Sequence, residues 1–279
     1  MTYQDILLPF LTYPDPPSPS PMQAAFDFAT QFNASLTAVL LDLDAHRSAW
    51  PSSLGTSLAG ISDLVGEALA QSHGNSRRVV EQLEAEASRS LARLNIVHEP
   101  TKIFPSALPV VERARLHDLT IMAATWGFER WFNEAVIFES GSPILFLPDE
   151  RPSVSLDTIA LAWDFSLPAT RALRASLPLL SKAKNVRVFT VSNEKSSTAG
   201  RTIEDLQRHL LEHEIPFVFD EVDIAGRNIG DAFRDYTQSV RADVLVMGAF
   251  GHSRVREFVL GGATQSMLTD AQLPVLFAH

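Results

Sequence analysis

Short apolar runs recur along the chain, and stretches of helical period, rich in alanine and leucine, separate them. Runs of this length, bounded by turn-forming residues, are typical of buried strands. Strands that alternate with helices predict βαβ units and a parallel sheet covered by helices on both faces. The predicted strands are Ile6–Leu11, Ser35–Leu43, Asp118–Ala123 and Pro143–Leu147, followed by Ile159–Asp164, Val186–Ser192, Asp243–Gly248 and Pro274–Ala278.

The pattern of the first half of the chain returns in the second half. In each half a strand is followed by a helical stretch, at 22–33 and again at 168–182, and then by a second strand. Self-similarity of this kind indicates a duplication. We therefore predict an α/β fold of two tandem Rossmann-like domains, 1–148 and 157–279, joined by the polar linker 149–156. Each would hold about five parallel strands and four helices, and this duplication fits better than a single nine- or ten-stranded sheet.

The two copies differ in length in two places. The first copy has extra residues around His46–Gly74, which predict a loop and an extra or extended helix. It is shorter than the second copy between the fourth and fifth strands, where a ligand loop would lie in a parallel sheet.

Chemically informative residues follow two strands of the second half. Asp164 ends the first strand, Gly248 and Gly251 follow the fourth, and Gly261-Gly262 opens the last helical stretch. Parallel sheets bind ligands at the carboxyl ends of their strands. Glycines allow close backbone approach, and free N–H groups at a helix start attract anions. This arrangement predicts a phosphate cradle, with Asp164 accepting hydrogen bonds from a ribose or an adenine amino group.

The spacing Gly248-x2-Gly251-x9-Gly261 resembles the nucleotide-binding signature of universal stress proteins, and the opening 162–166 and closing 273–279 segments are similar too. The resemblance is strong in the second half and weak in the first. It implies a tandem universal stress protein with the adenine-nucleotide α-hydrolase-like fold and an ATP or ADP site, any metal being nucleotide-bound magnesium. The binding residues it implies are Asp164, Val191, Met247, Gly248, Gly251, His252, Gly261, Gly262, Ala263 and Thr264.

One position of the signature departs from the ATP-binding branch of that family. Gly262 stands where a serine or threonine is usual. Glycine keeps the backbone N–H but lacks a hydroxyl that would contact phosphate, a loss of about 0.5–1.5 kcal/mol. Thr264 is the hydroxyl that would substitute for it.

The first half departs further. Leu11 occupies the place of Asp164, Ala123 that of Gly248, and Trp126 that of Gly251. Its first loop, 14–21, is rich in proline, so it is stiff and poor in N–H donors. We predict that this half binds no nucleotide in the family manner, and that Trp126, Trp131 and Phe132 fill the space of the missing loop.

Composition narrows the class of protein. The chain of 279 residues is 46% hydrophobic and 20% charged, has no cysteine, and carries a net charge of −10. Such acidity disfavours nucleic-acid and membrane partners. The absence of a basic N-terminal region and of long apolar runs predicts neither signal peptide nor membrane span, so we expect a cytoplasmic protein.

Other candidate sites are weaker. His209 and His213 share a helix face, but the segment is HLLEH and no third metal ligand is evident, which favours a solvated face. His252 and Ser253 would complete a Ser-His-Asp triad with Asp164, but the sequence has no G-x-S-x-G elbow, which disfavours a hydrolase site. Arg254 and Arg256 would neutralise a triphosphate, contact a partner domain or be ordinary surface charge. Asp231 is read as a cap or first-turn acid of a helix over 231–241.

These observations predict a stress-response binding or signalling module that is not an enzyme, or at most hydrolyses ATP slowly. The alternative is a scaffold that binds protein partners without nucleotide. An enzyme of the wider α-hydrolase group ranks lower, since an SGGxDS-type loop is missing. The resemblance also implies that the two closing strands pair inside one chain, giving a pseudo-twofold monomer that dimerises again.

Overall fold

A computed structural model describes residues 2–44, 59–123, 130–149, 151, 153–192, 203–224, 226–249, 262–269 and 272–279. In this part of the chain each half holds five strands and four helices, as the hydrophobic pattern predicts. The first half consists of β1 (Asp5–Leu11), α1 (Pro19–Phe32), β2 (Ser35–Leu43), α3 (Ala59–Ser90), β3 (Leu94–Thr101), α4 (Leu108–Ala114), β4 (Leu119–Ala123), α5 (Arg130–Glu139) and β5 (Ile144–Leu147).

The second half repeats this order of strands and helices. It consists of β6 (Thr158–Ala162), α6 (Leu167–Leu180), β7 (Asn185–Ser192), α7 (Ile203–Glu212), β8 (Val218–Asp223), α8 (Ile229–Ser239), β9 (Val244–Gly248), α9 (Gly262–Thr269) and β10 (Val275–Ala278). The predicted helix at 231–241 begins two residues earlier than expected, because Asn228 caps α8 by accepting a hydrogen bond from the N–H of Gly230 at 2.8 Å.

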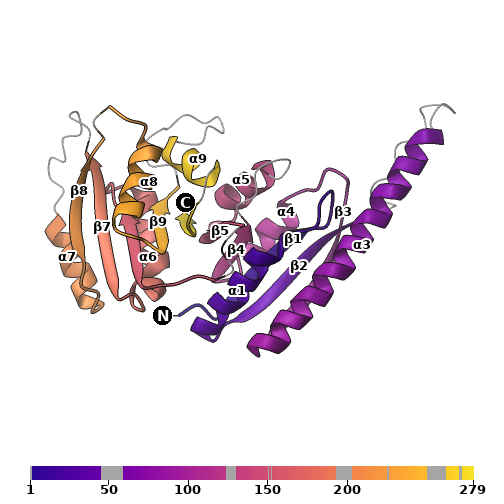
Figure 1. Ribbon diagram of the computed structural model, residues 1–279, viewed down its shortest axis with the longest axis horizontal. Coiled ribbons are helices and arrows are strands. Elements are labelled where there is room, and N and C mark those ends of the chain that lie inside the picture. Colours follow the sequence, from indigo (N-terminus) through magenta and orange to yellow (C-terminus); the bar gives the residue numbers. More distant parts are fainter. Residues whose placement is uncertain are drawn as a thin grey trace.

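All ten strands form one sheet, in the order β3-β2-β1-β4-β5-β10-β9-β6-β7-β8. Every pairing is parallel except that of β5 with β10, which is antiparallel and joins the two halves at the centre. Figure 1 shows the halves side by side, with β8 near one end and α3 along the other. The sequence analysis sets a duplication against a single ten-stranded sheet, whereas the structure combines the two. The halves do repeat, and their edge strands continue one ladder because unpaired strand edges bond to each other.

Helices cover both faces of this sheet, and each face has its own core. Helices α1, α3, α6 and α7 pack on one face, against alternate strand residues such as Ile6, Leu145 and Leu276. Helices α4, α5, α8 and α9 pack on the other, against the residues between them, such as Leu7, Phe146 and Phe277. This alternation follows from the two-residue period of a strand, and it explains why the runs are apolar throughout.

Contacts other than the sheet also join the two halves. The Tyr3 hydroxyl donates to the carbonyl of Ala175 in α6 at 2.5 Å, and the Gln31 amide donates to the carbonyl of Val154 at 2.9 Å. Burial, together with the charge of Asp118, raises the pKa of Tyr3 well above its ordinary value, which keeps this hydroxyl a donor. The predicted pairing of the closing strands within one chain is confirmed.

The extra residues of the first copy lengthen one helix. The helix α3 has 32 residues, whereas its counterpart α7 has 10. One end of α3 projects beyond the sheet (Figure 1), which confirms the predicted extended helix. Among the described residues no helix is long and apolar enough to cross a membrane.

Candidate functional site

The predicted site lies where the strand order of the second half reverses. The strand β6 pairs with β7 on one side and with β9 on the other, so the chain leaves β6 in one direction and returns to its opposite side. Ligands of open α/β sheets bind outside the carboxyl ends of strands at such a point. Asp164 follows β6 there, and Gly248 is the last residue of β9.

A short turn holds Asp164 in place. The Asp164 Oδ1 atom accepts a hydrogen bond from the N–H of Ser166 at 2.9 Å, which is the geometry of an Asx turn. Between them Phe165 has a φ of +61°, in the left-handed region that non-glycine residues rarely adopt. Ser166 then caps α6 by accepting from the N–H of Ala169 at 3.1 Å. The sequence motif contains Ser166, but only the structure gives it this role.

The first glycine of the signature has a structural reason of its own. A β carbon built on Gly248 would lie 2.5 Å from the backbone N of Ala169 and 2.5 Å from the carbonyl carbon of Pro168. These distances are far below van der Waals contact, so β9 approaches the start of α6 as only glycine allows. The packing of α6 therefore accounts for Gly248 without a ligand.

Two other predicted residues contribute their side chains to the core. Met247 is buried and Val191 is partly buried, and both belong to the cluster covered by α8 and α9. Their side chains face protein, so what they would offer a ligand is the backbone at the strand ends. The sequence pattern places them at this edge but does not show which way they face.

The last residues of the signature, Gly262, Ala263 and Thr264, form the start of α9. Gly262 opens the helix, and Ala263 is partly buried next to the core. Thr264 is only 2% exposed, which does not favour the expected contact between its hydroxyl and a phosphate. The predicted residues Gly251, His252 and Gly261, like Ser253, Arg254 and Arg256, lie outside the described residues.

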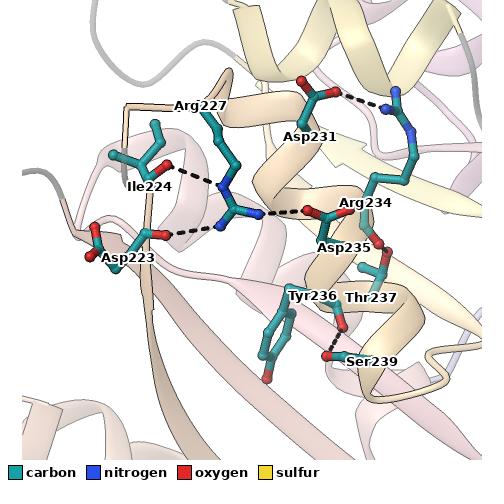
Figure 2. A network of polar contacts seen from close by, with 9 residues as sticks. All are labelled: Asp223, Ile224, Arg227, Asp231, Arg234, Asp235, Tyr236, Thr237 and Ser239. Carbon is teal, nitrogen blue, oxygen red and sulfur yellow. Dashed lines mark hydrogen bonds and ion pairs between the residues drawn. The ribbon is translucent and has the colours of Figure 1, made fainter.

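A polar network fixes α8, the helix against which α9 packs. Figure 2 shows the Arg227 guanidinium donating to the Asp235 carboxylate at 2.7 Å and to the carbonyls of Asp223 and Ile224 at 3.2 and 3.3 Å. Asp231 lies in the first turn, as predicted, and accepts from Arg234 at 2.8 Å.

Farther along α8, Tyr236 ties the helix to the sheet. The Tyr236 hydroxyl donates to the Asp220 carboxylate of β8 at 2.6 Å. Burial and this hydrogen bond raise the pKa of Tyr236, so the phenol stays protonated and remains a donor.

At its other end α8 meets α9 directly. A β carbon on Gly230 would lie 2.1 Å from the Ser266 hydroxyl oxygen, so the two helices approach closely there. A side chain at Gly230 would therefore meet α9 at Ser266.

The weaker candidates do not form a site among the described residues. His209 is exposed on α7 and His213 is exposed just after that helix ends, with their ring centroids 4.8 Å apart. The described parts of the chain contain no group of three or more potential metal ligands. In the first half Phe132 is buried, as expected of a filler, whereas Trp131 is 39% exposed; Trp126 lies outside the described residues.

The fold, together with a candidate site at the carboxyl ends of parallel strands, defines an α/β protein of the doubly wound class. One chain contains two copies of this unit. The family model described as "Universal stress protein family" matches residues 156–279. A universal stress protein of Synechocystis sp. (strain ATCC 27184 / PCC 6803 / Kazusa), Slr1230, is 38% identical over 56 residues, which is 20% of each chain. The aligned segment therefore spans only about a fifth of that curated relative.

Solved structures share the whole architecture. A universal stress protein from Archaeoglobus fulgidus DSM 4304 covers 98% of this chain and 95% of its own, with a TM-score of 0.69 and 16% identity. A protein of unknown function from Pseudomonas aeruginosa PAO1 covers 99% of this chain and 92% of its own, with a TM-score of 0.56 and 13% identity. Residues 156–279 are thus similar to the universal stress protein family, and the full length of the chain shares its fold with these solved structures.

Proposed function

We propose that the second half binds an adenine nucleotide, ATP or ADP, at the carboxyl ends of β6 and β9. The observation that carries this proposal is the placement of Asp164, a half-buried carboxylate held in a turn at the point where the strand order reverses. A carboxylate there accepts hydrogen bonds from ribose hydroxyls or from an adenine amino group. The resemblance of the glycine spacing to the family's ATP-binding branch supports the same ligand.

The phosphates would meet backbone donors rather than a cationic field. The chain carries a net charge of −10, which repels anions at long range. The N–H groups at the start of α9, beginning at Gly262, offer the local partial positive charge of a helix N-terminus. Magnesium would arrive bound to the nucleotide.

Such a site serves a stress-response binding or signalling module better than a fast enzyme. The hydroxyls described next to Asp164 have structural partners, because Ser166 caps α6 and Thr190 donates to the Trp163 carbonyl. Neither of these two hydroxyls is hydrogen-bonded there to a side chain that would act as its general base. We therefore expect nucleotide hydrolysis to be slow compared with binding and release.

Calorimetric titration of the full chain with Mg-ATP tests the proposal. We expect saturable heat that is lost in Asp164→Ala and in Gly251→Val. Asp164→Asn keeps an oxygen that can accept from Ser166, so it separates the carboxylate charge from the turn. Asp205→Ala, which removes an exposed carboxylate of α7, is the matched control and should bind as the wild type does. Absence of heat at millimolar ATP with the chain folded would overturn the proposal and leave the scaffold function.

Gly262→Ser is the reverse test. If the missing hydroxyl is the main departure from the ATP-binding branch, this change should tighten ATP binding by about 2- to 10-fold, the equivalent of one neutral hydrogen bond. Unchanged affinity would show that the hydroxyl is not the missing contact.

A further inference from the structure

The first half has a cavity at the position that the nucleotide site occupies in the second half. Its volume is about 300 Å³, at the small end of ligand pockets. The ends of β1 and β4 form its floor, and the proline-rich loop after β1, the start of α1 and Phe132 of α5 form its walls. The topology makes the two positions equivalent, because β1 lies between β2 and β4 as β6 lies between β7 and β9.

The lining of this cavity is mainly apolar. Leu11, which stands where the second half has Asp164, belongs to it, and so does Ala123, the counterpart of Gly248. Met22 and Phe132, both almost fully buried, add a thioether and an aromatic ring. Apolar walls of this kind bind hydrocarbon or aromatic surface.

Hydrogen bonds from α3 hold the proline-rich wall in position. The Asn75 amide donates to the carbonyls of Thr12 and Pro14 at 3.0 and 3.4 Å, and the Gln71 amide donates to the Pro14 carbonyl at 2.8 Å. The Thr12 hydroxyl is bonded to the Leu41 carbonyl at 2.9 Å and to the Ser72 hydroxyl at 2.6 Å. Prolines and these hydrogen bonds fix the loop before any ligand binds, so little ordering entropy is lost on binding.

The charge at the cavity disfavours phosphate. Among the described lining residues the only charged one is Asp15, which is exposed at the rim. The buried Asn133 adds an amide, and the described lining contains no lysine, arginine or histidine. A carboxylate at the mouth repels anions and attracts neutral donors or cations.

We propose that this cavity binds a small, mainly apolar molecule that is uncharged or cationic. The polar end of the ligand would face Asp15, and its apolar body would fill the space between the prolines and Phe132. This inference concerns the first half and does not depend on nucleotide binding in the second.

Two dyes that share one ring system test the proposal. N-phenyl-1-naphthylamine is uncharged, and 8-anilino-1-naphthalenesulfonate is the same ring system with an added sulfonate. In fluorescence titrations of the full chain we expect saturable binding of the neutral dye, about tenfold tighter than that of the anion. Saturating ATP should not displace the neutral dye. Equal affinities, or no saturable binding of the neutral dye, would overturn the proposal.

Two variants and one control locate the site. Ala123→Phe fills the cavity and should weaken the neutral dye about tenfold or more. Asp15→Asn removes the rim charge and should narrow the gap between the two dyes, whereas Asp63→Asn, an exposed carboxylate on α3, should leave it unchanged. An unchanged titration of Ala123→Phe would contradict the assignment.

Hydrogen exchange on the wild type needs no variant and covers the case in which Ala123→Phe fails to fold. The neutral dye should protect amides in residues 8–22 and 119–123. Protection confined to the second half, near 158–166 or 244–249, would overturn the proposal even if the dye binds.

Discussion

The carboxyl ends of β1 and β6 occupy equivalent places in the two halves but have opposite chemistry. After β6 comes a carboxylate, Asp164, held in a turn that leads into a capped helix. The strand β1 ends with Leu11, and a proline-rich loop that α3 holds by hydrogen bonds follows it. The strands are alike because both halves bury them in the same way, whereas the loops beyond them face no such constraint. One fold thus presents two kinds of surface to ligands.

The fourth strands of the two halves, β9 and β4, differ in how tightly their carboxyl ends are packed. At the end of β9 the start of α6 lies so close that only glycine fits, at Gly248. At the end of β4 the corresponding Ala123 borders a cavity. A glycine that looks like part of a nucleotide motif is here also required by packing.

The largest expected effect comes from adding a side chain at these two positions. Gly248→Val should lower the free energy of unfolding by about 3 kcal/mol, because its β carbon overlaps the backbone of Pro168 and Ala169. Ala123→Val, the matched change in the first half, should cost about 1 kcal/mol or less, since the cavity gives it room. Urea denaturation measures both. Equal costs would show that the two strand ends do not differ in packing.

A smaller effect is expected where α3 holds the proline-rich loop. Asn75→Ala removes the donor to the carbonyls of Thr12 and Pro14 in a buried setting. We expect a loss of about 1–3 kcal/mol in urea denaturation, together with weaker binding of the neutral dye. His73→Ala, an exposed neighbour on the same helix, is the control. Stability lost without any change in dye affinity would mean that the loop is not a wall of the binding site.

The smallest expected change in stability concerns the serines at the N-cap positions of α6 and α1. Ser166 accepts a hydrogen bond from the N–H of Ala169, so Ser166→Ala should cost about 1 kcal/mol. Ser18 occupies the same cap position before α1 but makes no such bond, so Ser18→Ala should change stability by about 0.5 kcal/mol or less. Thermal unfolding of the pair measures the difference, and a Ser18→Ala loss as large as that of Ser166→Ala would contradict it.

Much of the fold follows from the hydrophobic pattern. The strand Ser35–Leu43 has its predicted bounds, and the predicted strands at 118–123 and 243–248 are one residue too long at their beginnings. Buried strands are predictable because their apolar runs are short, uniform and closed by turn residues. The predicted start of the helix over 231–241 differs from the observed start at Ile229. That start depends on a capping bond of the Asn228 side chain, which hydrophobic periodicity does not show.

The candidate site was predictable only in part. The positions of Asp164 and Gly248 follow from the strand ends together with the rule for parallel sheets. The burial of Thr264 and the direction of Met247 do not, because they depend on residues far away in sequence. The turn through Phe165 is local, but the hydrophobic pattern does not show a left-handed residue other than glycine. The sequence does not predict the cavity of the first half for the same reason. Three separate segments form its walls, and hydrogen bonds from α3 hold one of them in place.

The sequence by itself determined that the chain is a duplicated α/β protein and that the two copies differ at their strand ends. Those properties are local: they rest on period, spacing and residue type. The tertiary structure decided that the two sheets join through β5 and β10, that packing requires Gly248, and that the first half encloses an apolar cavity. These properties depend on which distant segments meet, and side-chain contacts and strand edges settle that only in the folded chain.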